Sequence, residues 1–149
     1  MQGIAILGST GSIGRNTLRV VDCLSERFRV VAIGARRNVK ELAEQIARYR
    51  PEVVSVETEA SGEELARAVH GLNAPPPRIV CGELGLVEVA THEAAACVVS
   101  ATVGAVGLVP TLRALEAGKR VALANKETLV MAGAVMQSRA RIRGRDFAG

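Results

Sequence analysis

The feature that most constrains this chain is a glycine-rich turn near its N-terminus, placed between an apolar run and a helical pattern. Residues 4–7 are apolar and predict a buried strand, and apolar residues at helical spacing begin at Ile13. Between them, glycines at positions 8, 11 and 14 form the pattern G-x-x-G-x-x-G. A tight turn from a strand into a helix directs backbone N–H groups and the positive end of the helix toward one point. The sequence therefore predicts a phosphate-binding turn of the dinucleotide-binding kind.

Each of the three glycines has its own physical role in such a turn. Gly8 lets the chain turn sharply off the strand, Gly11 lets the backbone approach a pyrophosphate, and Gly14 lets the helix pack closely on the strand. The alternative is a tight turn with no ligand, which is disfavoured because the pattern lies between a strand and a helix. The residues expected at the cofactor phosphates are Gly8, Thr10, Gly11, Ser12 and Ile13.

Apolar runs alternate with amphipathic stretches along the rest of the chain, which predicts parallel strands joined by helices. Further strands are expected at residues 30–33, 53–56, 79–80, 95–99 and 120–123. Helices are expected at residues 13–24, 39–48, 61–69, 85–90, 104–117 and 127–137, the second with Asn38 as its N-cap. The predicted fold is α/β, with a doubly wound, mostly parallel sheet of the Rossmann type. Residues 1–137 are expected to form this domain, and residues 138–149 a disordered or irregular basic tail.

The composition fits such a domain and argues against nucleic acid as a partner. Hydrophobic residues make up 48% of the 149 residues and aromatic residues only 2%. The core must therefore be aliphatic, as in a parallel sheet covered by helices, and few rings are present to stack on bases. The net charge of +4 arises mostly from four arginines after residue 138, so no basic stripe lies within the predicted domain.

The cysteines and histidines show no pattern of a metal site or of a disulfide framework. The three cysteines are scattered and are interpreted as small buried residues in a reducing compartment, and both histidines as surface residues. No apolar stretch is long enough to span a membrane, and no signal peptide precedes the first strand. A cytoplasmic protein with no membrane partner is expected.

The residues after the second predicted strand indicate which nicotinamide cofactor is bound. A site for NAD usually has a carboxylate there, which accepts a hydrogen bond from the ribose 2′-hydroxyl. This chain instead has Gly34 and, after Ala35, Arg36, Arg37 and Asn38. Two guanidinium groups suit a 2′-phosphate, and the amide of Asn38 can be presented to the same group. NADPH is therefore predicted, the alternative being that both arginines are ordinary solvated loop charges.

A second group of polar residues follows the strand predicted at 120–123. Asn125, Lys126 and Glu127 lie at its carboxyl end, where open α/β sheets bind ligands. Lys126 is a candidate to hold an anionic or carbonyl-bearing substrate, and Asn125 and Glu127 to position the nicotinamide half of the cofactor. The alternative is a helix N-terminus with Asn125 as its cap and Glu127 in its first turn, and both interpretations can hold together.

Several segments resemble the 1-deoxy-D-xylulose 5-phosphate reductoisomerase family, in the same order along the chain. They are residues 6–14, 17–18, 28–32, 38–39, 103–112, 114, 117–119 and 124–130, and the resemblance extends to about Gln137. It implies an NADPH-dependent enzyme of non-mevalonate isoprenoid biosynthesis, which rearranges 1-deoxy-D-xylulose 5-phosphate and reduces the product to 2-C-methyl-D-erythritol 4-phosphate. Members need Mg²⁺, Mn²⁺ or Co²⁺ and usually form homodimers.

The resemblance also assigns roles to residues. It implies that residues 10–13 bind the NADPH phosphates, that residues 36–38 surround the 2′-phosphate, that Asn125 and Glu127 contact NADPH, and that Lys126 binds the phosphosugar substrate. The family's metal-binding Asp-Ser-Glu motif has no counterpart, because the chain contains no Asp-x-Glu. We therefore expect neither metal ligands nor catalytic residues, and a truncated domain that holds NADPH without turning over alone. The alternatives are a non-catalytic NADPH-binding or redox-sensing module, and a non-functional translation product.

Overall fold

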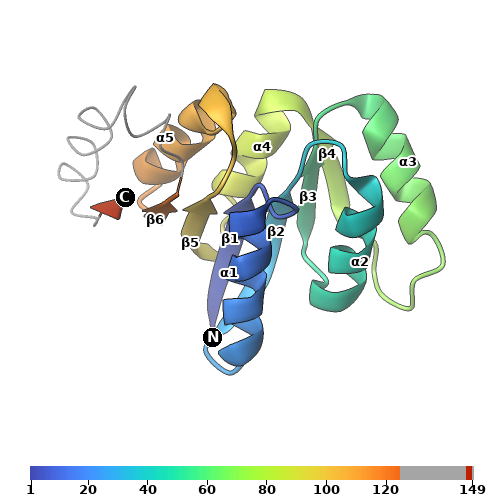
Figure 1. The fold of residues 1–149 in the computed structure, drawn as a ribbon, viewed down its shortest axis with the longest axis horizontal. Coiled ribbons are helices and arrows are strands. Elements are labelled where there is room, and N and C mark those ends of the chain that lie inside the picture. Colours follow the sequence, from blue (N-terminus) through green and yellow to red (C-terminus); the bar gives the residue numbers. More distant parts are fainter. Residues whose placement is uncertain (125–146, 149) are drawn as a thin grey trace.

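The computed structural model describes residues 1–124 and 147–148, and within them a single parallel sheet forms the centre of the fold. Its strands lie in the order β4-β3-β2-β1-β5-β6-β7, and all neighbouring strands are parallel (Figure 1). The strands are β1 (Gln2–Leu7), β2 (Phe28–Gly34), β3 (Val53–Val56), β4 (Arg78–Cys81), β5 (Ala95–Ser100), β6 (Arg120–Leu123) and β7 (Phe147–Ala148). Each strand predicted from the sequence is confirmed.

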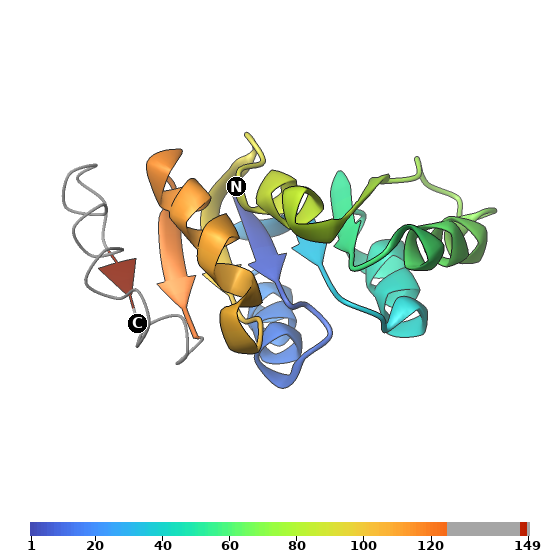
Figure 2. The same ribbon diagram turned by 90° about the horizontal axis from the view of Figure 1, so that it is seen from above.

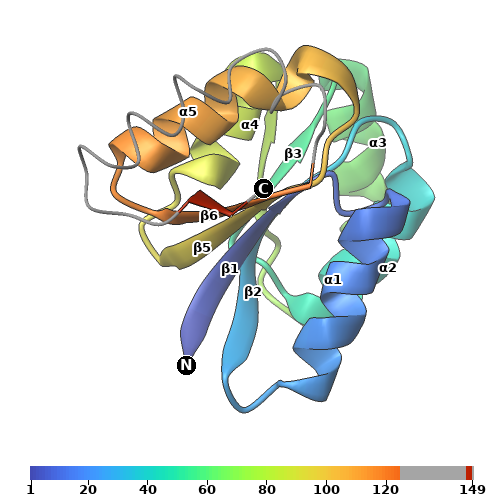
Figure 3. The same ribbon diagram turned by 60° about the vertical axis from the view of Figure 1, so that its left-hand side comes forward.

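Helices cover both faces of this sheet (Figures 2 and 3). One face packs against α1 (Ser12–Cys23), α2 (Val39–Tyr49) and α3 (Glu59–Val69), and the other against α4 (Gly82–Ala90) and α5 (Leu108–Glu116). The chain therefore winds in both directions from β1, and the predicted doubly wound Rossmann-type fold is confirmed. None of the helices among the described residues has the length and apolar character needed to cross a membrane.

The core consists of two aliphatic layers, one on each side of the sheet. Ile6 and Ile33 of the sheet pack with Leu42 of α2 in one layer, and Leu7 packs with Leu115 of α5 in the other. All five side chains are fully buried. Residues 4–7 of β1 alternate between the two layers, and β2 and β3 also contribute to both. Both faces of these strands are therefore apolar, which is why they appear in the sequence as continuous apolar runs.

Three helices differ from the sequence-based expectation at their N-termini. The α4 helix begins at Gly82 rather than Gly85. The α3 helix begins at Glu59 rather than Ser61, because the Thr58 hydroxyl accepts a hydrogen bond from the Ser61 N–H (3.1 Å) and caps the helix. The segment predicted as one helix over 104–117 is a 3₁₀ turn (Gly104–Gly107) followed by α5, with Pro110 in the first turn of α5. Asn38 caps α2 as predicted.

Two segments predicted near the C-terminus lie wholly or mostly outside the described residues. The helix predicted at 127–137 lies outside the described residues. Of the predicted irregular tail, the described residues Phe147–Ala148 form β7, which pairs with β6.

Two predictions about side-chain burial are wrong, one for the cysteines and one for His92. Cys23 is exposed and Cys81 and Cys97 are partly exposed, although all three were expected to be buried. His92 is not a surface residue, because its side chain is only 11% exposed and its Nε2 lies 3.2 Å from a carboxylate oxygen of Glu52. His70 is exposed, as predicted.

The order of the strands reverses between β1 and β5, which makes their carboxyl ends the topological switch point of the sheet. Strand β1 lies at the centre, with β2 on one side and β5 on the other. Gly8 follows β1 with a φ of +88°, and a Cβ there would lie 2.7 Å from the Ala101 carbonyl oxygen. Ligands of open α/β sheets bind at this point of the topology. The fold therefore places the glycine-rich turn where a ligand is expected.

We predict that Gly14→Ala destabilises the protein by about 1–3 kcal/mol, because the added methyl group overpacks a backbone contact. A Cβ at Gly14 would lie 2.6 Å from Ser9 Cα and nearer still to the Gly8 carbonyl oxygen. The matched control is Gly62→Ala in α3, where a Cβ would meet only side-chain methyls at 3.6 Å. The control is expected to stabilise by about 0.5–1 kcal/mol. Urea unfolding measures both, and a Gly14→Ala variant as stable as wild type would contradict the prediction.

Candidate cofactor-binding site

The glycine-rich turn is held in place by main-chain and side-chain hydrogen bonds from the second β–α unit. The N–H groups of Gly8 and Ser9 both donate to the Gly34 carbonyl oxygen, at 2.8 and 2.9 Å. On the other side, Gln45 Nε2 of α2 donates to the Ser9 carbonyl oxygen at 3.0 Å, and this glutamine is buried. The peptide that begins the turn is thus fixed by β2 and by α2, so the shape of the turn is set before any ligand arrives.

The outer side of the same turn is open. Gly11, Ser12 and Ile13 are exposed and Thr10 is partly exposed. A Cβ at Gly11 would have only the Gly8 carbonyl oxygen near it, at 3.6 Å. Gly11 is the N-cap of α1 and provides no side-chain cap, and no acidic residue lies in the first turn. The Gly11 N–H donates to the Gly8 carbonyl oxygen at 3.3 Å. The N–H groups that follow it, at the positive end of α1, are available to an anion, and the turn fits a phosphate group.

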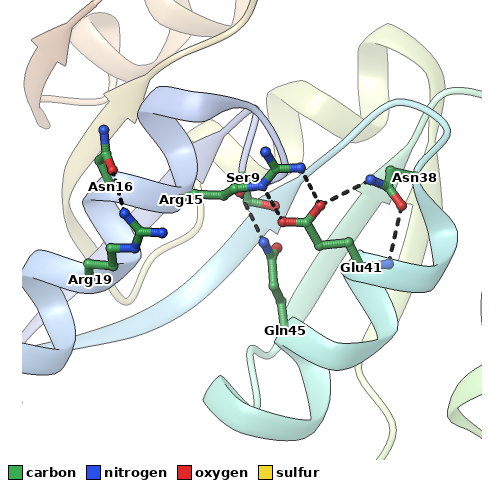
Figure 4. A network of polar contacts seen from close by, with 7 residues as sticks. All are labelled: Ser9, Arg15, Asn16, Arg19, Asn38, Glu41 and Gln45. Carbon is green, nitrogen blue, oxygen red and sulfur yellow. Dashed lines mark hydrogen bonds and ion pairs between the residues drawn. The ribbon is translucent and has the colours of Figure 1, made fainter.

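A network of polar side chains joins the first turn of α1 to the first turn of α2 (Figure 4). Arg15 donates to both carboxylate oxygens of Glu41, from Nε at 2.6 Å and from Nη2 at 2.7 Å. Asn38 Nδ2 donates to the same carboxylate at 3.0 Å, and Asn38 Oδ1 accepts from the Glu41 N–H at 3.2 Å. The Arg15 guanidinium holds the pKa of the Glu41 carboxyl below its ordinary value. This carboxylate therefore stays ionised and anchors both partners.

The two arginines after β2 converge on one carboxylate. Arg36 Nη2 donates to Glu57 Oε1 at 3.0 Å, and Arg37 Nε donates to Glu57 Oε2 at 2.6 Å. The hydrogen bond from Arg37, followed by that from Arg36, holds the pKa of the Glu57 carboxyl below its ordinary value. The arginine side chains are 62% and 77% exposed, whereas that of Glu57 is 29% exposed. The arginines are thus paired and oriented, yet most of each side chain remains accessible to a ligand.

A cavity of about 240 Å³ opens beside Arg36, at the carboxyl ends of β2, β3 and β4. Its walls are mainly apolar, and the charged groups of Arg36 and Glu57 lie on its lining. A flat apolar ring with a phosphate near its edge suits such a cavity. The lining residues are Ala35, Arg36, Ser55, Val56, Glu57, Gly82, Glu83, Leu86, Ala105, Val106 and Val109.

The structure brings the predicted residues of the turn and those after β2 to one edge of the sheet. Gly34 itself is buried, and its carbonyl serves the turn, so it shapes the site without facing a ligand. Asn38 uses its amide to cap α2 and to contact Glu41. The predicted site residues Asn125, Lys126 and Glu127 lie outside the described residues. The chain leaves β6 at this same edge, where the Ala124 N–H donates to the Ser100 carbonyl oxygen.

Three contributors to the site were not predicted from the sequence. They are Glu57, Gln45 and the apolar lining of the cavity. Gln45 and Glu57 lie 36 and 20 residues from their partners Ser9 and Arg37, so no local pattern links them. The one available signal for Glu57 was its position directly after the strand predicted at 53–56, where side chains reach the carboxyl edge of the sheet.

The model of the family 1-deoxy-D-xylulose 5-phosphate reductoisomerase matches residues 4–133. The chain belongs to this reductoisomerase family. The reductoisomerase of a Synechococcus strain is 49% identical over 136 residues, which cover 91% of this chain and 34% of that protein. The chain therefore spans about a third of the length of the curated reductoisomerases it matches.

Solved structures of reductoisomerases share the fold closely. A crystal structure of DOX-P reductoisomerase in complex with magnesium superposes with a TM-score of 0.91 at 38% identity, over 97% of this chain and 36% of that one. The reductoisomerase of Zymomonas mobilis in complex with NADPH gives 0.89 at 35% identity, over 99% of this chain and 38% of that one. The chain thus shares the backbone fold of the corresponding third of these reductoisomerases.

We predict a favourable coupling between Arg15 and Glu41 that depends on pH. The pKa of Glu41 is lowered in the folded protein relative to its ordinary value of 4.5, so the pair stabilises the fold above that pH. The coupling should be lost progressively as the pH falls below 4.5 and the carboxylate becomes protonated. A double-mutant cycle with Arg15→Ala and Glu41→Gln, measured by urea unfolding at pH 7 and pH 4, tests this.

The variant Arg15→Lys is the matched control for geometry, because it keeps the charge but not the two-pronged contact. It should retain only part of the coupling. A coupling that is zero at pH 7, or that grows as the pH falls, would contradict the prediction.

Proposed function

We propose that residues 1–137 are the NADPH-binding domain of a 1-deoxy-D-xylulose 5-phosphate reductoisomerase, followed by the basic tail. The observation that carries the proposal is one edge of the sheet with two anion-binding features. The N-terminus of α1 has no side-chain cap at Gly11, and Arg36 and Arg37 follow β2 at the same edge of the sheet. A ligand with a pyrophosphate and a separate phosphomonoester matches both features, and NADPH is such a ligand.

Each part of the site has a role in holding this cofactor. The backbone N–H groups of Ser12 and Ile13 bind the pyrophosphate, which lies close to the backbone of Gly11, and the hydroxyl groups of Thr10 and Ser12 add donors. The Gly11 N–H itself donates to the Gly8 carbonyl oxygen within the turn. The adenine ring enters the apolar cavity, and Arg36 and Arg37 bind the 2′-phosphate at its rim. When bound, NADPH supplies the reducing equivalent of the reaction. The residues of this chain bind and orient it.

The remaining assignments rest on the family resemblance. We propose that Asn125 and Glu127 contact the nicotinamide half of NADPH and that Lys126 binds the phosphosugar substrate, 1-deoxy-D-xylulose 5-phosphate. A homodimer is proposed on the same ground. The cytoplasmic location proposed here comes from the sequence-based expectation given above. No three histidine, cysteine, aspartate or glutamate side chains among residues 1–124 and 147–148 gather in a way that would hold a metal ion. No step through a metal is therefore assigned to these residues.

We predict that the chain binds NADPH more tightly than NADH, and that Arg36 and Arg37 account for the difference. Loss of two charge-assisted hydrogen bonds in the double variant Arg36→Ala/Arg37→Ala should weaken NADPH binding on the order of 10- to 100-fold. NADH binding should change little. Arg67→Ala, at an exposed position on α3, controls for the loss of positive charge. Titration calorimetry measures the binding of NADPH and of NADH to the folded wild-type chain and to both variants. Equal affinities for NADPH and NADH in wild type would contradict the proposal.

We predict that Gly11→Ala weakens NADPH binding about tenfold without destabilising the fold, since a methyl group there occupies space needed by the pyrophosphate. The backbone of Gly11 has a φ of −78°, which alanine adopts readily, and a Cβ there would meet only the Gly8 carbonyl oxygen, at 3.6 Å. Titration with NADPH and urea unfolding of the same sample test the two halves. Gly62→Ala should bind as wild type does. A Gly11→Ala variant with wild-type affinity would argue against pyrophosphate at this turn.

A further inference from the structure

Glu57 stands in an unusual position for a site that binds a doubly charged phosphate. It lies directly after β3, and its backbone N–H donates to the Arg36 carbonyl oxygen at 3.1 Å. Its two carboxylate oxygens take one hydrogen bond each from Arg36 and Arg37. The same side chain lines the cavity proposed for adenine. A negative charge is thus fixed between the two cations that are expected to bind the 2′-phosphate.

The pairing has two consequences for a nucleotide at this site. First, each arginine has one N–H directed to Glu57, so a 2′-phosphate shares both guanidinium groups with a carboxylate of like charge. Second, NAD-selective sites usually have a carboxylate after the second strand, which accepts a hydrogen bond from the ribose 2′-hydroxyl. Glu57 follows β3 instead, but its contacts with Arg36 and Arg37 hold its carboxylate beside the residues that follow β2. Glu57 therefore opposes the phosphate of NADPH and offers a partner to the hydroxyl of NADH.

Resting on the function proposed above, we propose that Glu57 is a specificity-determining residue that limits the preference of this site for NADPH over NADH. The arginines create the preference and Glu57 reduces it. Two other acidic side chains lie at this edge of the sheet. Glu41 is engaged by Arg15 and Asn38 on α1 and α2, and Glu83 lines the same cavity, but Arg36 and Arg37 donate to Glu57. The proposal concerns binding of the adenosine end and requires no chemistry from Glu57.

The test is the substitution Glu57→Gln, which keeps the size of the side chain and one acceptor for the arginines but removes the charge. The probes are adenosine 2′,5′-bisphosphate and 5′-AMP, which differ only in the 2′-phosphate, together with NADPH and NADH. Calorimetry should show adenosine 2′,5′-bisphosphate and NADPH binding about 5- to 10-fold tighter to the variant, as expected for removing one charge near a phosphate. Binding of 5′-AMP and NADH should be unchanged or weaker.

Two further variants keep the result interpretable. Glu57→Asp retains the charge and should keep the wild-type ratio of NADPH to NADH affinity, even if its stability changes. Glu64→Gln, at an exposed position on α3, makes the same change in net charge away from the site and should also keep that ratio. The gain in Glu57→Gln should shrink as salt is raised, because it is electrostatic.

The outcomes separate this inference from the function on which it rests. Wild-type chain that is folded but binds neither NADPH nor adenosine 2′,5′-bisphosphate would overturn both. Wild-type binding of NADPH with an unchanged or lower NADPH-to-NADH ratio in Glu57→Gln would overturn the inference alone. A lower ratio would mean that Glu57 orients the arginines for the phosphate, which is the opposite role.

Discussion

One carbonyl group, that of Gly34, organises the site. It ends β2 and accepts the N–H groups of both Gly8 and Ser9, so the first residues after β1 are tied to the end of the neighbouring strand. After Ser9 the chain continues into α1, and two residues after Gly34 it reaches Arg36. The separation between the open helix N-terminus and the arginines therefore follows from parallel pairing of β1 with β2. Two anion-binding features at a fixed separation are what a dinucleotide with an added phosphate requires.

Around this point the charges are arranged so that the cations are oriented without being neutralised. Arg15, Arg36 and Arg37 share two carboxylates, Glu41 and Glu57, which leaves one net positive charge in the group. Both carboxyl groups have lowered pKa values because arginines donate to them, so they are ionised at neutral pH. The positive end of α1 adds to the same field. The edge of the sheet thus attracts an anion, while its guanidinium groups are already held in defined directions.

The sequence predicted what depends on local pattern and missed what depends on tertiary contact. Apolar runs identify the strands because both faces of the sheet are covered, and Asn38 was recognised as a cap because capping acts over three residues. The pairing of Glu57 with the arginines and the bond from Gln45 to Ser9 join segments at least 20 residues apart. The prediction for His92 is wrong for the same reason, since its partner Glu52 lies far away in the sequence, directly before β3. Such contacts exist only once the strand order is known.

The three glycines of the turn show how folding and binding are combined in one short motif. Gly8 has positive φ and lies against Ala101, and Gly14 lies against Ser9, so the backbone of the folded chain requires glycine at both positions. At Gly11 the backbone has an ordinary conformation and a side chain would have room. Glycine is tolerated at an N-cap but the fold does not require it there. The proposed pyrophosphate, close to the backbone, is a reason for glycine at this position. Of the three glycines, the middle one, Gly11, is therefore the one that favours the proposal of a bound ligand.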